Sequence, residues 1–157
     1  MSPHHEAALI RHLPDPTAVR TGENALLPWL VRWLLLTGRL RSRTSLAYEV
    51  PWLGRRVDVA LLTSRGVTTA FELKIGSLQR ALEQAAYNRS TFHRSWVVTG
   101  NRPKPEGVQW AVELGVGLLV IQDGAISRVT TPELRRPHPI TINRLRDAIV
   151  TRAAAME

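Results

Sequence analysis

Cysteine is absent from the 157 residues of this chain. Disulfide bonds and thiolate metal sites are therefore excluded, and the sequence is compatible with a reducing compartment. Apolar runs long enough to cross a membrane are also missing. The N-terminal segment MSPHHEAALIRHLP does not have the basic-then-apolar order of a signal peptide. These absences predict a soluble, cytoplasmic protein that has no membrane partner.

Internal repeats and low-complexity tracts are missing as well. The length is typical of one domain with a hydrophobic core of its own. We therefore predict a single domain over residues 1–157. Its core is expected at about residues 21–131, and a C-terminal helix is expected at about residues 141–155.

Positive charge is abundant: the formal net charge is +8, and arginine far outnumbers lysine. Such an excess favours a polyanionic partner such as nucleic acid over a small neutral substrate. Each arginine cluster taken alone is also typical of a solvated surface, so the indication comes from their sum. The clusters are Arg39, Arg41 and Arg43; Arg55 and Arg56; and Arg135 and Arg136.

A β-hairpin is predicted between residues 55 and 75, because apolar residues alternate in both arms. Gly66 can supply the left-handed residue that closes a three-residue loop with a bulge, over residues 64–66. This loop sets the register of the two arms. The alternating apolar residues are Val57, Val59 and Leu61 in the first arm and Phe71, Leu73 and Ile75 in the second. The cross-strand pairs are then Ala60 with Ala70, Asp58 with Glu72, and Arg56 with Lys74.

The pairing of Asp58 with Glu72 is the feature that points to chemistry. Two carboxylates on adjacent strands have Cβ atoms about 5 Å apart and repel each other. A divalent cation such as Mg²⁺ or Mn²⁺ reverses the effect, because it prefers converging oxygen ligands. Lys74 lies two residues along the same face. The alternative is a solvated polar face with an ordinary exposed pair of Glu72 and Lys74, and the residues alone leave both interpretations open.

The remaining patterns predict helices and strands on both sides of the hairpin. Pro28 means that the first helix begins near Asn24 or bends, so Glu23 lies at a terminus or a kink. The order of elements indicates an α/β domain on a mixed sheet. We expect helices at 21–37, 77–91, 105–114 and 141–155, with strands at 45–50, 95–99, 117–121 and 125–129. The apolar stripe of the last helix suits docking on the core or on a second copy of the chain.

A family resemblance rests on four ordered motifs: the helix with Glu23, the strand with Asp58, the sequence Glu72-Leu73-Lys74 and the helical Gln84. Over roughly residues 21–122 they resemble the motifs of the PD-(D/E)XK nuclease superfamily, the restriction-endonuclease-like fold. The resemblance implies an αβββαβ core with a mixed central sheet flanked by helices, to which the C-terminal helix is added.

Two positions depart from the superfamily pattern. Val57 stands where a proline often precedes the first carboxylate. The Gln-x-x-x-Tyr pattern of the RecB-like branch is absent, because Tyr87 comes one residue early and Asn88 occupies its place.

The resemblance implies a role for each matching residue. Asp58, Glu72 and the carbonyl of Leu73 resemble the ligands of Mg²⁺ or Mn²⁺, and Lys74 resembles the lysine that orients or activates the attacking water. Glu23 resembles the glutamate that helps to hold the metal or its waters, and Gln84 the polar residue of the following helix. The implied activity is phosphodiester hydrolysis by an endonuclease or exonuclease, with DNA as the expected substrate.

Four residues are expected to contact nucleic acid beside this site: Arg56, Arg80, Tyr87 and Asn88. Three functions compete on the sequence alone. The first is the nuclease, the second is a nucleic-acid-binding protein of the same fold that does not cut, and the third is a structural or oligomerising α/β protein. A homodimer is compatible with each of them.

Overall fold

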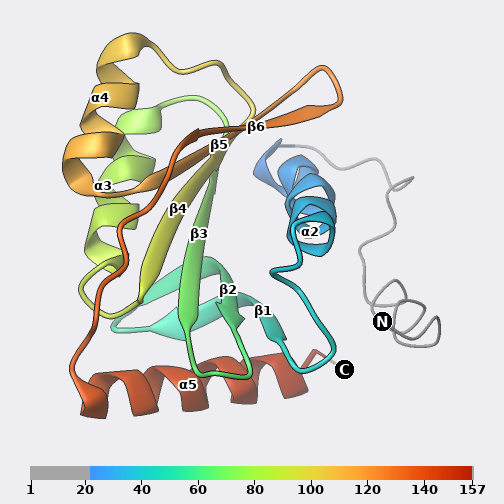
Figure 1. Cartoon of the computed structure of the whole chain (residues 1–157), viewed down its shortest axis with the longest axis vertical. Helices are drawn as coiled ribbons and strands as arrows, with labels where there is room; N and C mark the ends of the chain where they lie inside the picture. The colour runs from blue at the N-terminus through green and yellow to red at the C-terminus, as the bar shows by residue number, and fades with distance from the viewer. Residues whose placement is uncertain (1–21, 157) are drawn as a thin grey trace.

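The computed structural model describes residues 22–156 and has one mixed sheet flanked by helices (Figure 1). The six strands lie in the sheet in the same order as in the chain. Strands β1 to β3 form an antiparallel meander, β3, β4 and β5 run parallel, and β6 returns antiparallel to β5. The α/β class with a mixed central sheet is therefore confirmed.

The elements follow the expected order with small shifts at their ends. The strands are β1 Ser45–Trp52, β2 Arg55–Leu62, β3 Thr68–Lys74, β4 Arg94–Thr99, β5 Gly117–Gln122 and β6 Ala125–Thr130. The helices are the 3-10 turn η1 Gly22–Leu26, followed by α2 Leu27–Leu36, α3 Leu78–Asn88, α4 Pro105–Leu114 and α5 Pro139–Ala154. The N-terminal residues 1–21 lie outside the described part of the chain.

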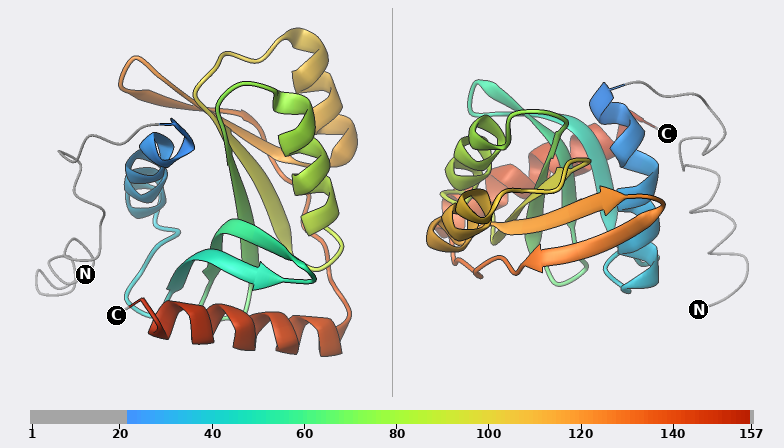
Figure 2. Two further views of the ribbon diagram at one scale, coloured as in Figure 1. Left: turned by 180° about the vertical axis from the view of Figure 1, so that it is seen from behind. Right: turned by 90° about the horizontal axis from the view of Figure 1, so that it is seen from above.

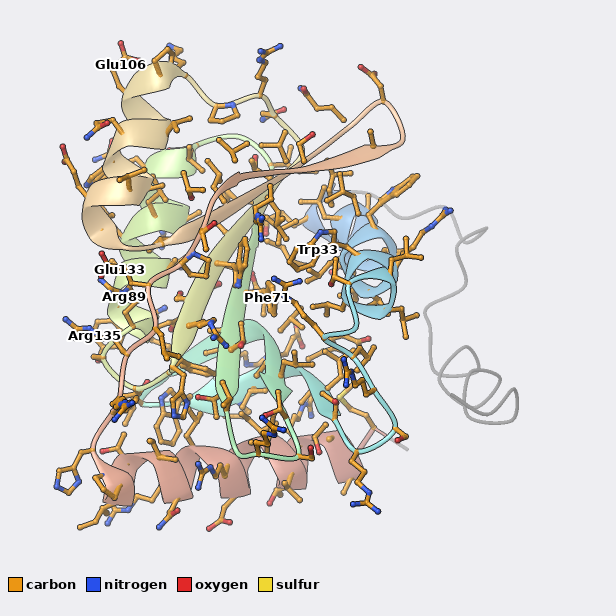
Figure 3. All side chains as sticks on the ribbon, in the orientation of Figure 1. Trp33, Phe71, Arg89, Glu106, Glu133 and Arg135 are labelled. Carbon is orange, nitrogen blue, oxygen red and sulfur yellow. The ribbon has the colours of Figure 1, made fainter. Side chains whose placement is uncertain are left out.

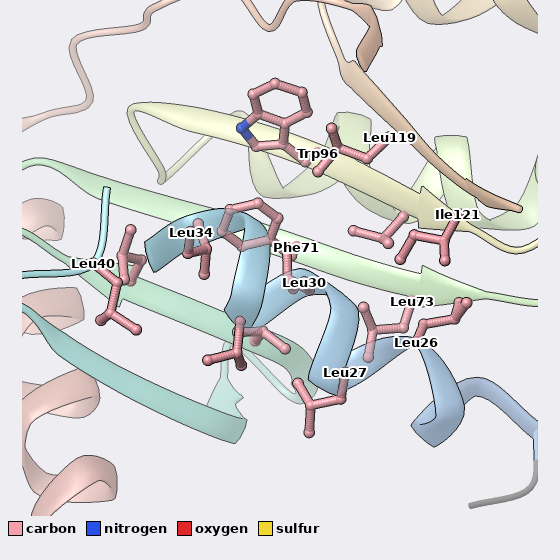
Figure 4. Packing of buried hydrophobic residues seen from close by; sticks show 14 residues of the cluster. Leu26, Leu27, Leu30, Leu34, Leu40, Phe71, Leu73, Trp96, Leu119 and Ile121 are labelled. Carbon is pink, nitrogen blue, oxygen red and sulfur yellow. The ribbon is translucent and has the colours of Figure 1, made fainter. Parts of the chain in front are cut away.

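Helices cover both faces of the sheet (Figure 2). Helix α2 packs on one face, where its leucines meet Phe71 and Trp96 in the largest apolar cluster (Figure 4). The rings of Phe71 and Trp96 stack with centroids 6.2 Å apart. On the other face α3 and α4 pack against Val97 and Leu118, and α5 packs against the β1–β2 end. The parallel strands are therefore buried on both faces, as their continuous apolar runs require.

Helix α5 docks on the core of its own chain, so the alternative of a second copy is not needed to cover its apolar stripe. Leu145 and Ile149 are fully buried in one cluster with Val50 and Ala60. The helix begins at Pro139, two residues before the expected Thr141. Pro139 suits the first position of a helix, and the His138 side chain caps the helix by accepting a hydrogen bond from Ile140 N.

The segment between β6 and α5 contacts the rest of the fold through Arg89, the residue that follows α3. The Arg89 guanidinium donates to the carbonyl of Leu114 and to Glu133 Oε2, the latter at 2.9 Å. Figure 3 shows Arg89 and Glu133 next to each other. This contact joins α3, the end of α4 and the segment after β6.

Four pairs of the β2–β3 hairpin have the expected register, whereas the expected pairs Asp58–Glu72 and Arg56–Lys74 lie beyond the end of the ladder. Val59 pairs with Phe71 and Ala60 with Ala70. The loop closes through a hydrogen bond from Thr63 N to Val67 O at 3.0 Å, and Gly66 has a φ of 78°. Turn chemistry alone was therefore sufficient to align the two strands.

The expectation that Val57 shares a face with Val59 and Leu61 is wrong. Val57 packs in the cluster beneath α5, whereas Val59 and Leu61 pack beneath α2. The alternation therefore breaks at Asp58. On β1, Glu49 lies at the neighbouring position with a φ of 48°, which indicates that both strands are irregular at this point.

Three further boundaries differ from expectation. Strand β1 continues through Pro51 to Trp52, because only Leu53 and Gly54, both with positive φ, form the turn. The first helix divides into η1 and α2, with Pro28 in the first turn of α2. Helix α3 spans Leu78–Asn88 instead of the expected 77–91, and the Ser77 side chain before it makes no capping hydrogen bond. Within residues 22–156, no helix is both long and apolar enough to span a membrane.

Candidate functional site

Two acidic side chains meet where β2 and β3 separate. The ladder between the strands ends at the pair Val59–Phe71, one position before Asp58 and Glu72. Beyond it, Leu73 N donates to Asp58 Oδ2 at 2.8 Å. The Asp58 carboxylate therefore takes the place of a strand partner for this N–H. The carboxyls of Asp58 and Glu72 are close enough to share a hydrogen bond.

Helix α3 supplies the contact that holds Glu72 in place. Asn88 Nδ2 donates to Glu72 Oε1 at 2.7 Å, and each of the two residues is only 3% exposed. Asn88 was expected to contact nucleic acid, but its burial and this hydrogen bond assign it to positioning Glu72 instead. Gln84, the expected helical partner, lies one turn earlier on α3 and is half-buried.

The environment favours a proton on Glu72. Burial raises the pKa of Glu72 to about 8, and the nearby charge of Asp58 adds to this, while Asn88 and Arg55 oppose it. Burial also raises the pKa of Asp58, although the N–H of Leu73 and the hydrogen bond with Glu72 act in the opposite direction. Near neutral pH the folded chain therefore favours the protonated form of Glu72 beside Asp58.

Lys74 lies at the end of β3 and is paired with a residue far away in the chain. Its Nζ donates to Glu23 Oε1 at 2.8 Å. Glu23 comes from η1, so the 3-10 turn before α2 places this carboxylate beside the strand end. The pair is partly exposed, with 29% of the Lys74 side chain and 43% of the Glu23 side chain accessible.

Glu23, which was expected to help hold the metal or its waters, is paired with Lys74 in this arrangement. Among residues 22–156, no three His, Cys, Asp or Glu side chains gather closely enough to bind one metal ion. Glu23 makes its short contact with the Lys74 ammonium, and it acts on Asp58 only through its charge.

Arg55 is a site residue that the sequence did not single out. Its Nη2 lies 3.8 Å from Glu72 Oε1, and its guanidinium lies over the Tyr87 ring, 4.5 Å from the centroid. The same Nη2 atom is buried and has no hydrogen-bond partner among the described residues. A buried donor without a partner costs free energy. An anion or a water bound beside Glu72 would provide the missing partner of Arg55 Nη2.

Arg56, the neighbour that was expected to contact nucleic acid, points elsewhere. It is exposed and pairs with Glu49 at 3.7 Å. Among the other expected contacts, Arg80 is exposed on α3, and Tyr87 is 51% exposed beneath Arg55. Side chains of β2 stop alternating between the two faces of the sheet at Asp58. Arg55 therefore lies on the same face as Glu72, in place of Arg56.

The donor chemistry of the site fits Mg²⁺ or Mn²⁺. Asp58 and Glu72 offer carboxylate oxygens from neighbouring strands, and Leu73 between Glu72 and Lys74 offers a backbone carbonyl. Hard divalent cations prefer such oxygen ligands. Burial raises the pKa of both carboxyls, so their ionised forms are poorly solvated, and a bound cation would offset that cost.

No protein-family model matches the chain, and no curated protein matches it either. Among solved structures, the chain is similar to the "SPO1766 protein of unknown function from Silicibacter pomeroyi", with a TM-score of 0.60 and 20% sequence identity. The likeness covers 87% of this chain and 88% of the other. At this level of identity the comparison concerns the fold alone.

Proposed function

We propose that the chain is a metal-dependent nuclease that hydrolyses phosphodiester bonds of nucleic acid, with DNA as its substrate. The observation that carries this proposal is the meeting of the partly buried Asp58 with the buried Glu72 on neighbouring strands, with Lys74 at the end of the strand that carries Glu72. Two adjacent acids of this kind destabilise a fold unless a proton or a cation compensates them. The pair therefore adds no stability of its own, and we take its presence as support for ligand binding.

The order of elements supports the same proposal. A helical segment is followed by three antiparallel strands, a crossover helix and a parallel strand. This order agrees with the αβββαβ core of the restriction-endonuclease-like fold, and the carboxyls lie on the second and third strands of that order. We therefore assign the domain to this fold as part of the proposal.

In the proposed site, Asp58, Glu72 and the Leu73 carbonyl would hold Mg²⁺ or Mn²⁺. When bound, the ion would polarise the phosphate and lower the pKa of a bound water. The side chains around it have separate tasks. Asn88 fixes the orientation of Glu72, and the N–H of Leu73 fixes that of Asp58.

The cationic side chains of the site would act on the substrate. Lys74 provides a positive charge next to the carboxyls, where it can orient the attacking water and stabilise charge on the phosphate. Glu23 keeps that ammonium in place through its 2.8 Å contact. Arg55 has a free donor beside Glu72, which can bind a phosphate oxygen.

A second candidate is a nucleic-acid-binding protein of the same fold that does not cut. The observation in its favour is that the site carries cations of its own: Arg55 lies 3.8 Å from Glu72, and Lys74 is already paired. These groups can balance the carboxyls without a metal. This function requires salt-sensitive binding with no cleavage.

Cleavage assays separate the two candidates. The full chain is incubated with labelled duplex, junction, flap and single-stranded substrates in Mg²⁺, in Mn²⁺ and in EDTA. We expect cleavage that requires metal. Asp58→Asn and Lys74→Met should each lower the rate by roughly a hundredfold or more, because they remove a ligand or a preorganised charge.

The chain offers a matched control for Lys74, because its other lysine is Lys104, which is exposed before α4. Lys104→Met should cleave like the unmodified protein. Undiminished cleavage in Lys74→Met or Asp58→Asn would contradict the assigned site. Salt-sensitive binding with no cleavage in any metal would establish the second candidate in place of the first.

A further inference from the structure

A polar cavity lies on the other face of the sheet from Glu72. Its volume is about 720 Å³. Thr69 and Phe71 of β3 line it, whereas Ala70 and Glu72 alternate with them and point to the opposite face. The loop after α2 (residues 38–44) and the β2–β3 turn provide its walls. The sheet therefore separates this cavity from the carboxyl pair.

The cavity is lined by arginines from three separate parts of the chain. No acidic side chain is among the residues that line it. None of these arginines takes part in an ion pair within residues 22–156, where the ion pairs involve other cations. The five arginines are Arg39, Arg41, Arg43, Arg65 and Arg94. Five arginines thus line one cavity without an acidic side chain among the described residues that surround it.

Two of the five guanidinium groups are held in place before any ligand arrives. Arg39 lies over the Trp33 ring at 4.5 Å from its centroid, and Arg41 Nε donates to Gly38 O at 2.7 Å. Burial lowers the pKa of Arg39, and the charges of Arg128 and Arg94 lower it further. Like charges are thus held near one another, which costs free energy that a bound anion would recover.

The size and the lining of the cavity indicate the class of anion. A volume of about 720 Å³ is within the range of sites for nucleotide-sized ligands, and a single small ion would leave most of it empty. Hydroxyl groups accompany the arginines, and both groups donate to phosphate oxygens. They belong to Ser42, Thr44, Thr63, Ser64, Thr69 and Thr131.

We propose that this arginine-lined cavity is a second anion site, which binds the phosphate groups of a nucleotide or of a nucleic-acid strand. Both sources present the same chemistry, a row of phosphate oxygens that planar guanidinium groups recognise. The site is independent of the carboxyl pair, since it is on the opposite face and contains no metal-ligand residues.

Binding measurements in EDTA test this proposal with the full chain. The probes are inorganic tripolyphosphate, adenosine triphosphate and a labelled single strand of about twelve nucleotides. The test variant is the double substitution Arg43→Glu and Arg65→Glu, in two exposed loops. The matched control is Arg136→Glu and Arg144→Glu, two exposed arginines outside the cavity that give the same change in net charge.

We expect the test variant to bind phosphate probes at least about tenfold more weakly, while the control changes by less than about threefold. Loss of triphosphate binding identifies a nucleotide site, and loss for the strand alone identifies a strand site. Equal weakening in both variants would show general attraction to a basic surface and overturn the proposal. Absence of binding by all three probes would overturn it as well.

Two further variants make the result independent of folding and of the proposed nuclease activity. The neutral pair Arg43→Gln and Arg65→Gln should also weaken binding, and its thermal unfolding should match that of the unmodified chain. Asp58→Asn should keep full phosphate binding in EDTA. If Asp58→Asn lost binding, the two sites would not be separate, and the proposal would fail whether or not the chain is a nuclease.

Discussion

Replacement of Glu72 by glutamine tests the electrostatic description of the carboxyl pair. Glutamine has nearly the same shape, and its amide can still accept from Asn88 and donate to Asp58. What it removes is the ability to ionise. The stabilities of the two proteins should therefore be similar in acid and should diverge as the pH rises.

The sign and the size of this divergence follow from the raised pKa. The pKa of Glu72 rises from 4.5 to about 8 in the folded chain. The protonated Glu72 contributes fully to the free energy of unfolding below about pH 4.5. This contribution is lost as the pH rises from about 4.5, where the unfolded chain loses the proton, through about 8, where the folded chain loses it. Each pKa unit corresponds to about 1.4 kcal/mol, so the whole difference is on the order of 5 kcal/mol.

Urea unfolding followed by tryptophan fluorescence provides the assay, since Trp33 and Trp96 contact each other in the core. Measurements at pH 5, 7 and 9 give the free energy of unfolding for both proteins. We expect Glu72→Gln to gain several kcal/mol relative to the unmodified chain between pH 5 and pH 9. Titrating groups remote from the pair, including His93, are common to both proteins and cancel in this difference, whereas Asp58 is coupled to Glu72 and contributes to it.

Divalent cations extend the same experiment to the proposed metal site. At pH 9 without metal, ionised Glu72 and Asp58 repel each other. Mn²⁺ at a hundred times its dissociation constant should stabilise the unmodified chain by about 2.7 kcal/mol, and it should have little effect on Glu72→Gln. Parallel pH dependence in the two proteins would refute the raised pKa. Equal responses to Mn²⁺ would refute the metal site but leave the pKa argument intact.

Two further substitutions have defined outcomes. Asn88→Ala removes the hydrogen-bond donor that lowers the pKa of Glu72. We expect the free energy of unfolding at pH 7 to fall by about 1–3 kcal/mol. An unchanged free energy would mean that this hydrogen bond does not stabilise the fold. Gly117→Ala would place a Cβ 2.4 Å from the Trp96 ring, so its melting temperature should fall by an amount equivalent to about 1–3 kcal/mol. Gly100→Ala meets only contacts of 3.4 Å or longer and should melt like the unmodified chain; a loss equal to that of Gly117→Ala would contradict the overpacking argument.

The hairpin shows how much local sequence can determine. The alternation of apolar residues and the position of Gly66 were enough to align Ala60 with Ala70. Because register follows from turn geometry, the proximity of Asp58 and Glu72 was predictable without any long-range information. The two-residue turn at Asp123-Gly124 was predictable for the same reason, and both residues have the positive φ that such a turn requires.

The partners of the carboxyl pair depended on the tertiary structure. Asn88, and not Gln84, reaches Glu72 because the rotation and height of α3 over the sheet are set by its packing on β4 and α4. Helical periodicity identifies the buried stripe, but it does not decide which flanking residue lies above a given strand position.

Direct contacts between distant segments were likewise beyond the reach of local sequence patterns. The family resemblance placed Glu23 in one site with Lys74, but their ion pair across 51 positions depends on the fold. The arginine-lined cavity joins loops and strand ends that share no motif. The break in alternation at Asp58, which turns Arg55 toward Glu72, accompanies the burial of Val57 beneath α5. The sequence by itself determined the strands, the turns and the meeting of two carboxyls, because these depend on neighbours in the chain. The tertiary structure decided which charges surround them, because that depends on how helices pack on the sheet.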